Sequence, residues 1–146
     1  MTSRRDREFD IGHPAPARGA VAPWRLAVAL GGAFAVWSVQ IGLGGALGGL
    51  ACLDPEGARS WIGQEAALRA LVALDVAAVA LGVWAMAIAL SNLRRTRREH
   101  AWHGGVMDAG EGRTRFLSVW GVWTSGLFLL AILVNAAVLL GRLPCP

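Results

Sequence analysis

Two polar residues, Asp75 and Asn135, lie inside long apolar stretches of the chain, where a carboxyl or an amide could do chemistry. Such residues are costly in lipid, and they usually face the protein interior or mark an ion path. Asp75 follows Arg69 by six residues and Asn135 precedes Gly141 by six, so we expect each about 9 Å below the same membrane surface. We therefore predict an intramembrane hydrogen bond between Asp75 and Asn135. A proton relay through Asp75 is the alternative, although no second carboxylate or His lies at that depth.

Two cysteines, Cys52 and Cys145, follow the first and the third apolar stretch. We predict both on the outer side of the membrane, where an oxidising periplasm permits a disulfide between them. Two free thiols or a two-thiolate copper site are the alternatives. Copper favours soft sulfur ligands, but neither Cys has a His or Met beside it. His100 and His103 lie in an Arg-rich segment, which we expect to be a solvated loop rather than a metal site.

The remaining residues show no pattern that is typical of an enzyme. The apolar stretches contain no His, which argues against a bis-His haem. The chain also has no glycine-rich phosphate loop and no nucleophile–base pair. We expect no enzyme activity, and we predict no catalytic, cofactor-binding or metal-binding residues. The formal net charge is +4, and because the basic residues flank the apolar stretches, a membrane explains them better than nucleic acid does.

Three stretches almost without charge define the architecture. They are residues 26–53 with no charge, 70–93 with Asp75 alone, and 116–141 with none. A helix of about 20 apolar residues crosses the hydrocarbon core, and it satisfies its own backbone hydrogen bonds there. The sequence predicts an all-α fold, an integral membrane bundle of three helices. We expect spans at about 24–51, 65–92 and 114–140 within a transmembrane domain of residues 23–146, preceded by a disordered cytoplasmic tail of residues 1–22.

The distribution of arginine predicts the orientation. All 14 basic residues are Arg, and Arg near the span ends favours the cytoplasmic side. Eleven lie in the tail or between the second and third spans, whereas only Arg59, Arg69 and Arg142 lie on the opposite side. We therefore expect the N-terminus inside and the C-terminus outside. The tail and the long first apolar stretch do not fit a cleaved signal peptide.

Small residues recur at helical spacing in all three spans and predict the packing faces, because they let membrane helices approach closely. The predicted faces are Gly31, Ala35, Ser38, Gly42, Gly45 and Gly49 in the first span; Ala78, Gly82, Ala85 and Ala89 in line with Asp75 in the second; and Ser118, Gly121 and Ser125 in the third, continuing through Phe128 and Ile132 to Asn135.

The opposite side of the first span carries a second set of residues, Trp37, Gln40, Gly44 and Gly48. Their spacing of three and four residues places them on one side of a helix. Because the small residues already supply an inward face, we predict that this set is a docking face for a partner in the membrane. A lipid-exposed Gln40 without any partner is the alternative.

Two segments carry a family resemblance. One runs from Gln40 to Cys52, and the other runs from Arg113 to Leu117 and on through residues 125–133 to Leu143-Pro144-Cys145. Together they resemble a group of small three-span membrane proteins encoded beside bacterial haem-copper cytochrome c oxidase genes. Those proteins have no established activity, so the resemblance implies a neighbourhood and not a mechanism, and the second span matches least.

The expected function is that of a non-catalytic accessory subunit or assembly factor of a respiratory cytochrome c oxidase, in the bacterial inner membrane. Its partners would be the lipid bilayer and an oxidase subunit. A self-associating membrane protein of the holin kind is one alternative, and a proton or small-solute carrier centred on Asp75 is another.

Overall fold

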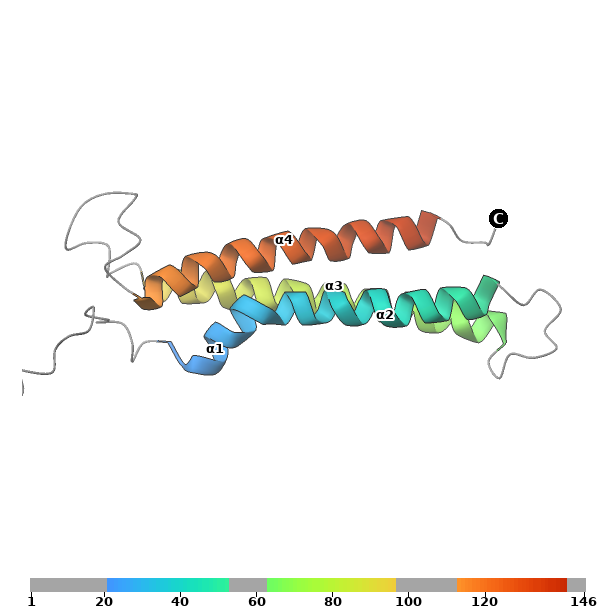
Figure 1. The fold of residues 1–146 in the computed structure, drawn as a ribbon, viewed down its shortest axis with the longest axis horizontal. Coiled ribbons are helices and arrows are strands. Elements are labelled where there is room, and N and C mark those ends of the chain that lie inside the picture. Colours follow the sequence, from blue (N-terminus) through green and yellow to red (C-terminus); the bar gives the residue numbers. More distant parts are fainter. Residues whose placement is uncertain (1–20, 53–62, 97–112, 142–146) are drawn as a thin grey trace, which may run out of the picture.

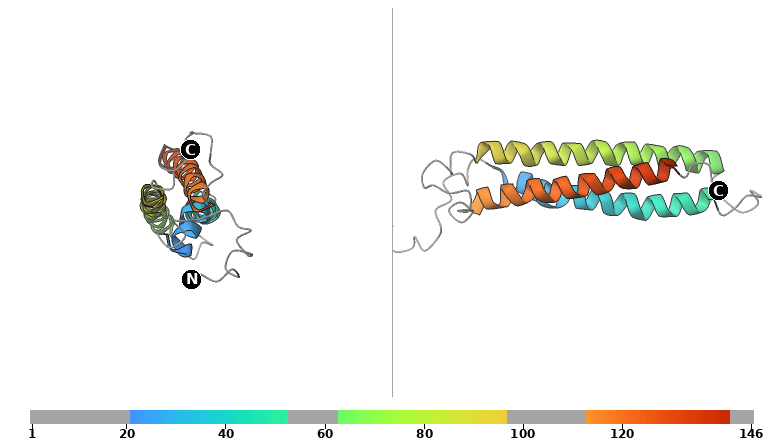
Figure 2. Two further views of the ribbon diagram at one scale, coloured as in Figure 1. Left: turned by 90° about the vertical axis from the view of Figure 1, so that its left-hand side faces the viewer. Right: turned by 90° about the horizontal axis from the view of Figure 1, so that it is seen from above.

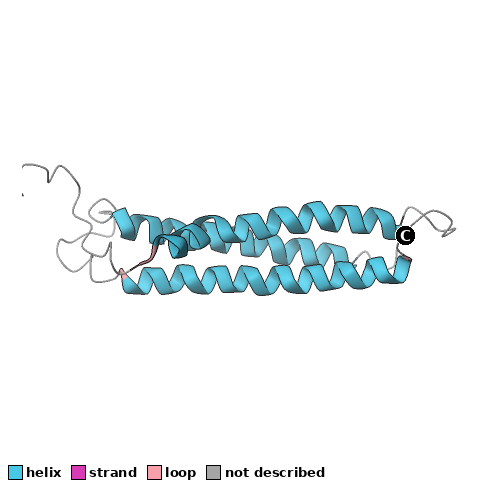
Figure 3. Ribbon diagram, turned by 90° about the horizontal axis from the view of Figure 1, so that it is seen from below, coloured by secondary structure: helices cyan, strands magenta, loops and turns pink. Residues whose placement is uncertain are grey.

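The computed structural model describes residues 21–52, 63–96 and 113–141, and these segments are helical with no strand among them (Figure 3). Three of their helical stretches are long and apolar enough to cross a membrane: Pro23–Gly49, Glu65–Arg95 and Thr114–Leu139. The predicted all-α, three-span architecture is therefore confirmed, and the chain is a multi-pass membrane protein. The tail, most of both loops and Cys145 lie outside the described residues, so the predicted tail disorder and orientation stay predictions.

The first span has three consecutive parts. It begins with α1 (Pro23–Ala27), continues through one π-helical turn, η2 (Val28–Gly32), and ends with α2 (Ala33–Cys52). Pro23 suits the first helical position, because its missing N–H would have no helical partner there. A π turn is rare and marks a local interruption of the α-helical ladder. Here it carries Ala29, which packs against α4.

The second and third spans are single uninterrupted helices. α3 (Gln64–Arg95) has 32 residues, which corresponds to a length of about 48 Å. Arg94 and Arg95 lie in its last turn, where cations are favoured by the helix dipole. α4 (Arg113–Gly141) has 29 residues. Neither helix contains Pro, so nothing in the sequence kinks or breaks it.

The three spans run side by side as one bundle (Figure 1). Seen along the bundle, the first span, α3 and α4 lie at the corners of a triangle (Figure 2), and each contacts the other two. The start of the first span, the end of α3 and the start of α4 share one end of the bundle. Gln40 of α2 and Asp75 of α3 lie side by side about a third of the way along α3.

The predicted small-residue faces of α3 and of the first part of α4 point inward, as expected. The buried members are Ala78, Gly82, Ala85 and Ala89 of α3 and Ser118, Gly121 and Ser125 of α4. The tightest approach is at Gly121, where an added Cβ would lie 2.9 Å from the Cβ of Ala29. The hydroxyl of Ser125 donates to the carbonyl oxygen of Ala29 at 2.7 Å, which fixes the π turn against α4. These small residues therefore allow the close packing that holds a membrane bundle together.

The predicted packing face of the first span is wrong. A Cβ added to Gly31, Gly42 or Gly45 would meet nothing within 4 Å, and Ala35 and Ser38 are exposed. The buried side of this span instead carries Ala29, Ala33, Gln40 and Gly44. Lipid is as apolar as a helix interface, so small residues alone do not say which side of a membrane helix faces its own bundle.

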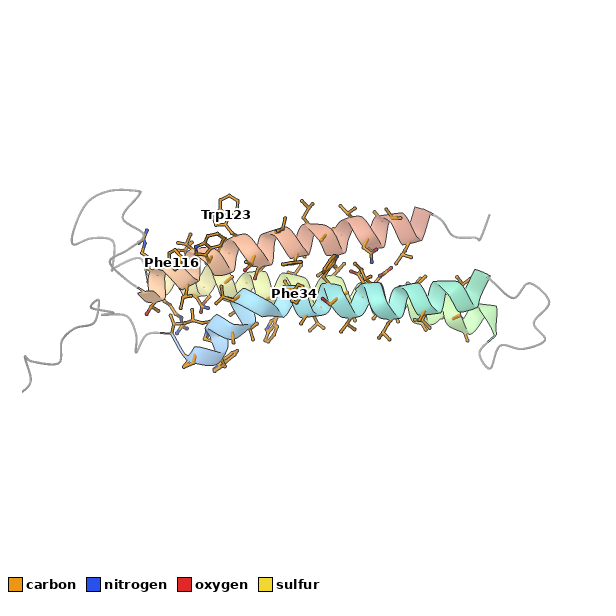
Figure 4. The ribbon with its side chains drawn as sticks, in the orientation of Figure 1. Phe34, Phe116 and Trp123 are labelled. Carbon is orange, nitrogen blue, oxygen red and sulfur yellow. The ribbon has the colours of Figure 1, made fainter. Side chains whose placement is uncertain are left out.

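Three aromatic residues pack against one another between α2 and α4. Phe34 meets Phe128 edge-on with ring centroids 5.1 Å apart, and Trp37 lies 5.4 Å from the same ring. Such tilted and edge-to-face pairs are the favoured aromatic geometries. Trp123 points away from the bundle instead (Figure 4) and is 72% exposed. Trp37 is therefore part of the bundle's packing, while Trp123 faces the surroundings.

Candidate functional site

The most unusual feature of the bundle is a buried pair formed by Gln40 of α2 and Asp75 of α3. Gln40 is 0% exposed and Asp75 is 4% exposed. The Gln40 Nε2 group donates a hydrogen bond to Asp75 Oδ1 at 2.9 Å and lies 3.4 Å from the carbonyl oxygen of Ile132 in α4. All three spans thus meet at this point, which we call the acid–amide pair.

The predicted hydrogen bond between Asp75 and Asn135 does not form. Gln40 lies 12 residues before the end of α2, and Asp75 lies 11 residues after the start of α3. The two are therefore level, and the residue of α4 that they meet is Ile132, whereas Asn135 lies three residues further toward the end of α4 and faces the groove described below. The prediction failed because it took Arg69 as the membrane boundary, although α3 continues beyond Arg69 to Gln64.

The acid–amide pair leaves two polar atoms without a partner. Gln40 Oε1 and Asp75 Oδ2 are both buried, and neither accepts nor donates a hydrogen bond within the described residues. Buried polar atoms are nearly always hydrogen-bonded, and each exception in a native structure calls for an explanation. These two oxygen atoms are therefore the place where the acid–amide pair could bind a proton or another group.

The predicted partner-docking face on α2 is also wrong for its central residues. Gln40 points into the bundle at Asp75, and a Cβ on buried Gly44 would lie 3.7 Å from Leu139 and 3.8 Å from Leu71. Trp37 packs on Phe128. Only Gly48 has open space beside it. The physical reason is that Asp75 needs a buried hydrogen-bond partner, and this need outweighs the packing of glycines.

A second polar group, which we call the Arg25 cluster, ties the start of the first span to the end of α3. Arg25 donates from Nε to Asn92 Oδ1 at 3.1 Å and from Nη2 to Ser91 Oγ at 2.9 Å. Asn92 Nδ2 donates back to the Arg25 carbonyl oxygen at 3.1 Å. The cluster was not predicted from the sequence; the available signal was an Arg and an Asn at corresponding ends of two neighbouring spans.

Asn135 lies beside a shallow groove between α2 and α4. The groove has a volume of about 450 Å³ and is lined by Trp37, Leu127, Leu130, Ala131, Val134, Asn135 and Val138. Asn135 is half-buried there. Its side chain makes no hydrogen bond within the described residues, so its amide faces the groove rather than the acid–amide pair.

The described residues assemble no metal site. Within residues 21–52, 63–96 and 113–141, no three His, Cys, Asp or Glu side chains come together in a way that could hold a metal ion. Cys52 is the last residue of α2, but Cys145, His100 and His103 lie outside the described residues. The disulfide between Cys52 and Cys145 therefore stays a prediction.

The chain was compared with protein-family models, with curated proteins and with solved structures, and none of them matches.

Proposed function

We propose that this protein is a non-catalytic accessory subunit or assembly factor of a respiratory cytochrome c oxidase in the bacterial inner membrane. The assignment to an oxidase is supported by the sequence resemblance of the first and third spans. The docking role is supported by one observation in the structure, a small-residue face that the bundle leaves uncovered. We call it the glycine face of α2, although its first residue lies in η2, and its residues are Gly31, Ala35, Ser38, Gly42 and Gly45.

The glycine face differs from the other small residues of the bundle. Gly121 and Gly82 each lie against a neighbouring helix, where a Cβ would meet another residue at 2.9 to 3.1 Å. Gly31, Gly42 and Gly45 have nothing within 4 Å. The hydroxyl of Ser38 is satisfied within its own helix by the Phe34 carbonyl oxygen at 2.9 Å. A second helix could therefore approach this uncharged face closely without leaving a polar group unpaired.

The proposed occupant is a transmembrane helix of an oxidase subunit. The glycine face spans residues 31–45, which is about 21 Å of helix, and it therefore lies at membrane depth rather than in water. It carries no charge, so the matching surface is an apolar helix with small or medium side chains. If a second copy of this chain occupies the face instead, the holin-like alternative, which is self-association, is favoured.

Affinity purification in a mild detergent tests this proposal. Gly42→Leu combined with Gly45→Leu adds bulk to the glycine face. Ala77→Leu combined with Ala80→Leu adds bulk at the same spacing on the exposed side of α3 and serves as the matched control. We expect oxidase subunits to co-purify with the wild-type chain and with the control, but not with the glycine-face variant.

Two results would count against the proposal. Oxidase subunits that stay bound to the glycine-face variant would place docking elsewhere. Recovery of the chain only with copies of itself, in an oligomer that the glycine-face variant abolishes, would favour self-association.

The carrier centred on Asp75 is a second candidate, favoured by the two unpartnered oxygen atoms of the acid–amide pair. Among the described residues, the nearest other acid is Glu65, which lies at the exposed end of α3 beside Arg69. Proton uptake by vesicles that contain the purified chain would reveal such an activity. Asp75→Asn would then abolish the uptake while the helical circular dichroism spectrum stayed unchanged. An accessory subunit predicts no uptake by either form.

A further inference from the structure

We infer that the acid–amide pair is a proton-binding site, in which Asp75 is a neutral carboxylic acid whose Oδ2 hydrogen is donated to Gln40 Oε1. The inference begins from the two atoms that the structure leaves unsatisfied. One belongs to each partner of a pair that is already joined by the 2.9 Å hydrogen bond from Gln40 Nε2 to Asp75 Oδ1. A single hydrogen atom shared between the two remaining oxygens would satisfy both.

A protonated Asp75 carboxyl complements the Gln40 carboxamide in both hydrogen-bond donors and acceptors. A carboxamide offers N–H donors and a carbonyl acceptor, and a protonated carboxyl offers one O–H donor and one carbonyl acceptor. In the proposed head-on pairing, the observed hydrogen bond from Gln40 Nε2 to Asp75 Oδ1 is joined by a second one from Asp75 Oδ2 to Gln40 Oε1, which closes a ring. An ionised carboxylate has acceptors only, so it cannot satisfy Gln40 Oε1, which would remain buried without a donor.

No described cation is placed to neutralise an ionised Asp75. The elements packed against it present Gln40 from α2 and the Ile132 carbonyl oxygen from α4. The other charged side chains that the structure describes lie toward the helix ends: Arg25, Glu65, Arg69, Arg94, Arg95 and Arg115. Arg69, the nearest cation along α3, is exposed and paired with Glu65. An unpaired charge inside a bilayer is costly, and a bound proton removes that charge.

A proton bound here has a structural consequence. The acid–amide pair is the contact at which all three spans meet, so the bound proton completes a hydrogen-bonded link between α2 and α3. Loss of the proton would leave a buried charge and an unsatisfied amide at the same point. This inference is independent of the oxidase proposal, because the glycine face lies on the other side of α2.

Infrared spectroscopy of the full chain in lipid vesicles at neutral pH tests the inference. A protonated carboxyl has a carbonyl stretching band that is separate from the carboxylate bands and moves to lower frequency in heavy water. We expect this band in the wild-type protein, and we expect Asp75→Asn to remove it. Glu65→Gln, which changes an exposed acid, is the matched control and should keep the band. Gln40→Ala should keep the band but move it to higher frequency, because its hydrogen bonds to the amide are lost.

Each outcome of these measurements supports or overturns the inference. Absence of the band from the wild-type spectrum, or its persistence in Asp75→Asn, would overturn the inference. An unchanged band frequency in Gln40→Ala would show that Gln40 is not the acceptor. Should Asp75→Asn lose its helical circular dichroism spectrum, the wild-type band and its shift in Gln40→Ala still test the site. A bound metal ion in place of the proton would show carboxylate bands only.

Discussion

The acid–amide pair and the Arg25 cluster both join the first span to α3, but they differ in how completely their hydrogen bonds are made. In the Arg25 cluster, Asn92 both accepts from Arg25 and donates back to it, and Ser91 receives a second guanidinium donor. In the acid–amide pair, one hydrogen bond joins the two side chains and Gln40 also donates to the Ile132 carbonyl oxygen, but two buried atoms stay unsatisfied.

The difference follows from position along the bundle. Arg25 is half-buried near the start of the first span, where a long cationic side chain can reach the membrane surface. Asp75 is buried about a third of the way along α3, and its short side chain can reach only neighbouring helices. Polar groups near the surface can thus carry charge and still be satisfied, whereas the buried acid depends on one partner and on the proton that it carries. Four substitutions test this comparison, and the free energy of unfolding in detergent micelles is the measurement.

The largest effect is expected from Gln40→Leu. This change removes the only side-chain partner that Asp75 has among the described residues, and an unsatisfied buried polar group costs about 1–3 kcal/mol. Ser38→Leu, on the exposed side of the same helix, is the matched control and should change the unfolding free energy little. Equal stability of Gln40→Leu and the wild-type protein would mean that the pair does not hold α2 to α3.

A smaller loss is expected from Asn92→Ala, which removes both hydrogen bonds between Asn92 and Arg25. Interhelical polar contacts in membranes are worth about 0.6–1.7 kcal/mol, and the freed Arg25 can be solvated at the membrane surface. Ser91→Ala, which removes one hydrogen bond, should cost less than Asn92→Ala. If Asn92→Ala cost more than Gln40→Leu, the contrast between the two sites would be reversed.

Asp75→Asn should leave stability almost unchanged. The introduced amide can donate to Gln40 Oε1 and accept from Gln40 Nε2, and so it mimics the neutral acid in both hydrogen bonds. Asp75→Leu should instead be destabilising, since Gln40 then has no side-chain partner. Strong destabilisation by Asp75→Asn would contradict the ring of two hydrogen bonds.

The smallest effect is expected from Asn135→Leu. Asn135 faces the groove and makes no hydrogen bond within the described residues, and substitutions away from such contacts usually change stability by less than about 0.5 kcal/mol. The purified chain should therefore unfold as the wild type does. A loss of unfolding free energy as large as that of Gln40→Leu would support the hydrogen bond between Asn135 and Asp75 that was predicted from the sequence.

The sequence predicted the helices well because long uncharged stretches in lipid have few alternatives to a helix. It also predicted the inward faces of α3 and α4. In both helices the stripe of small residues includes polar side chains, namely Asp75 in α3 and two serines in α4. For the first span, the side that was predicted to face the bundle is the side that the structure leaves exposed. Both of its sides carry small residues, and lipid provides no hydrophobic gradient that would distinguish them.

The partner of Asp75 was missed for a related reason. Two amide side chains, Gln40 and Asn135, were available at membrane depth, and the count from Arg69 favoured Asn135. A count from the true start of α3 at Gln64 places Gln40 at the matching level. The predicted span already began at about residue 65, but the depth of Asp75 was counted from Arg69, a charged residue that lies on the helix itself and pairs there with Glu65.

The uninterrupted length of α3 also affects the lipid around it. Between Arg69 and Arg94 lie 24 residues, which span about 36 Å, whereas a typical hydrocarbon core is about 30 Å thick. This hydrophobic mismatch must be taken up by tilt or by local thickening of the bilayer. Because α3 is tied to the first span both at Asp75 and at Asn92, it cannot tilt alone. A change in bilayer thickness would therefore tilt the three helices together, as one rigid body.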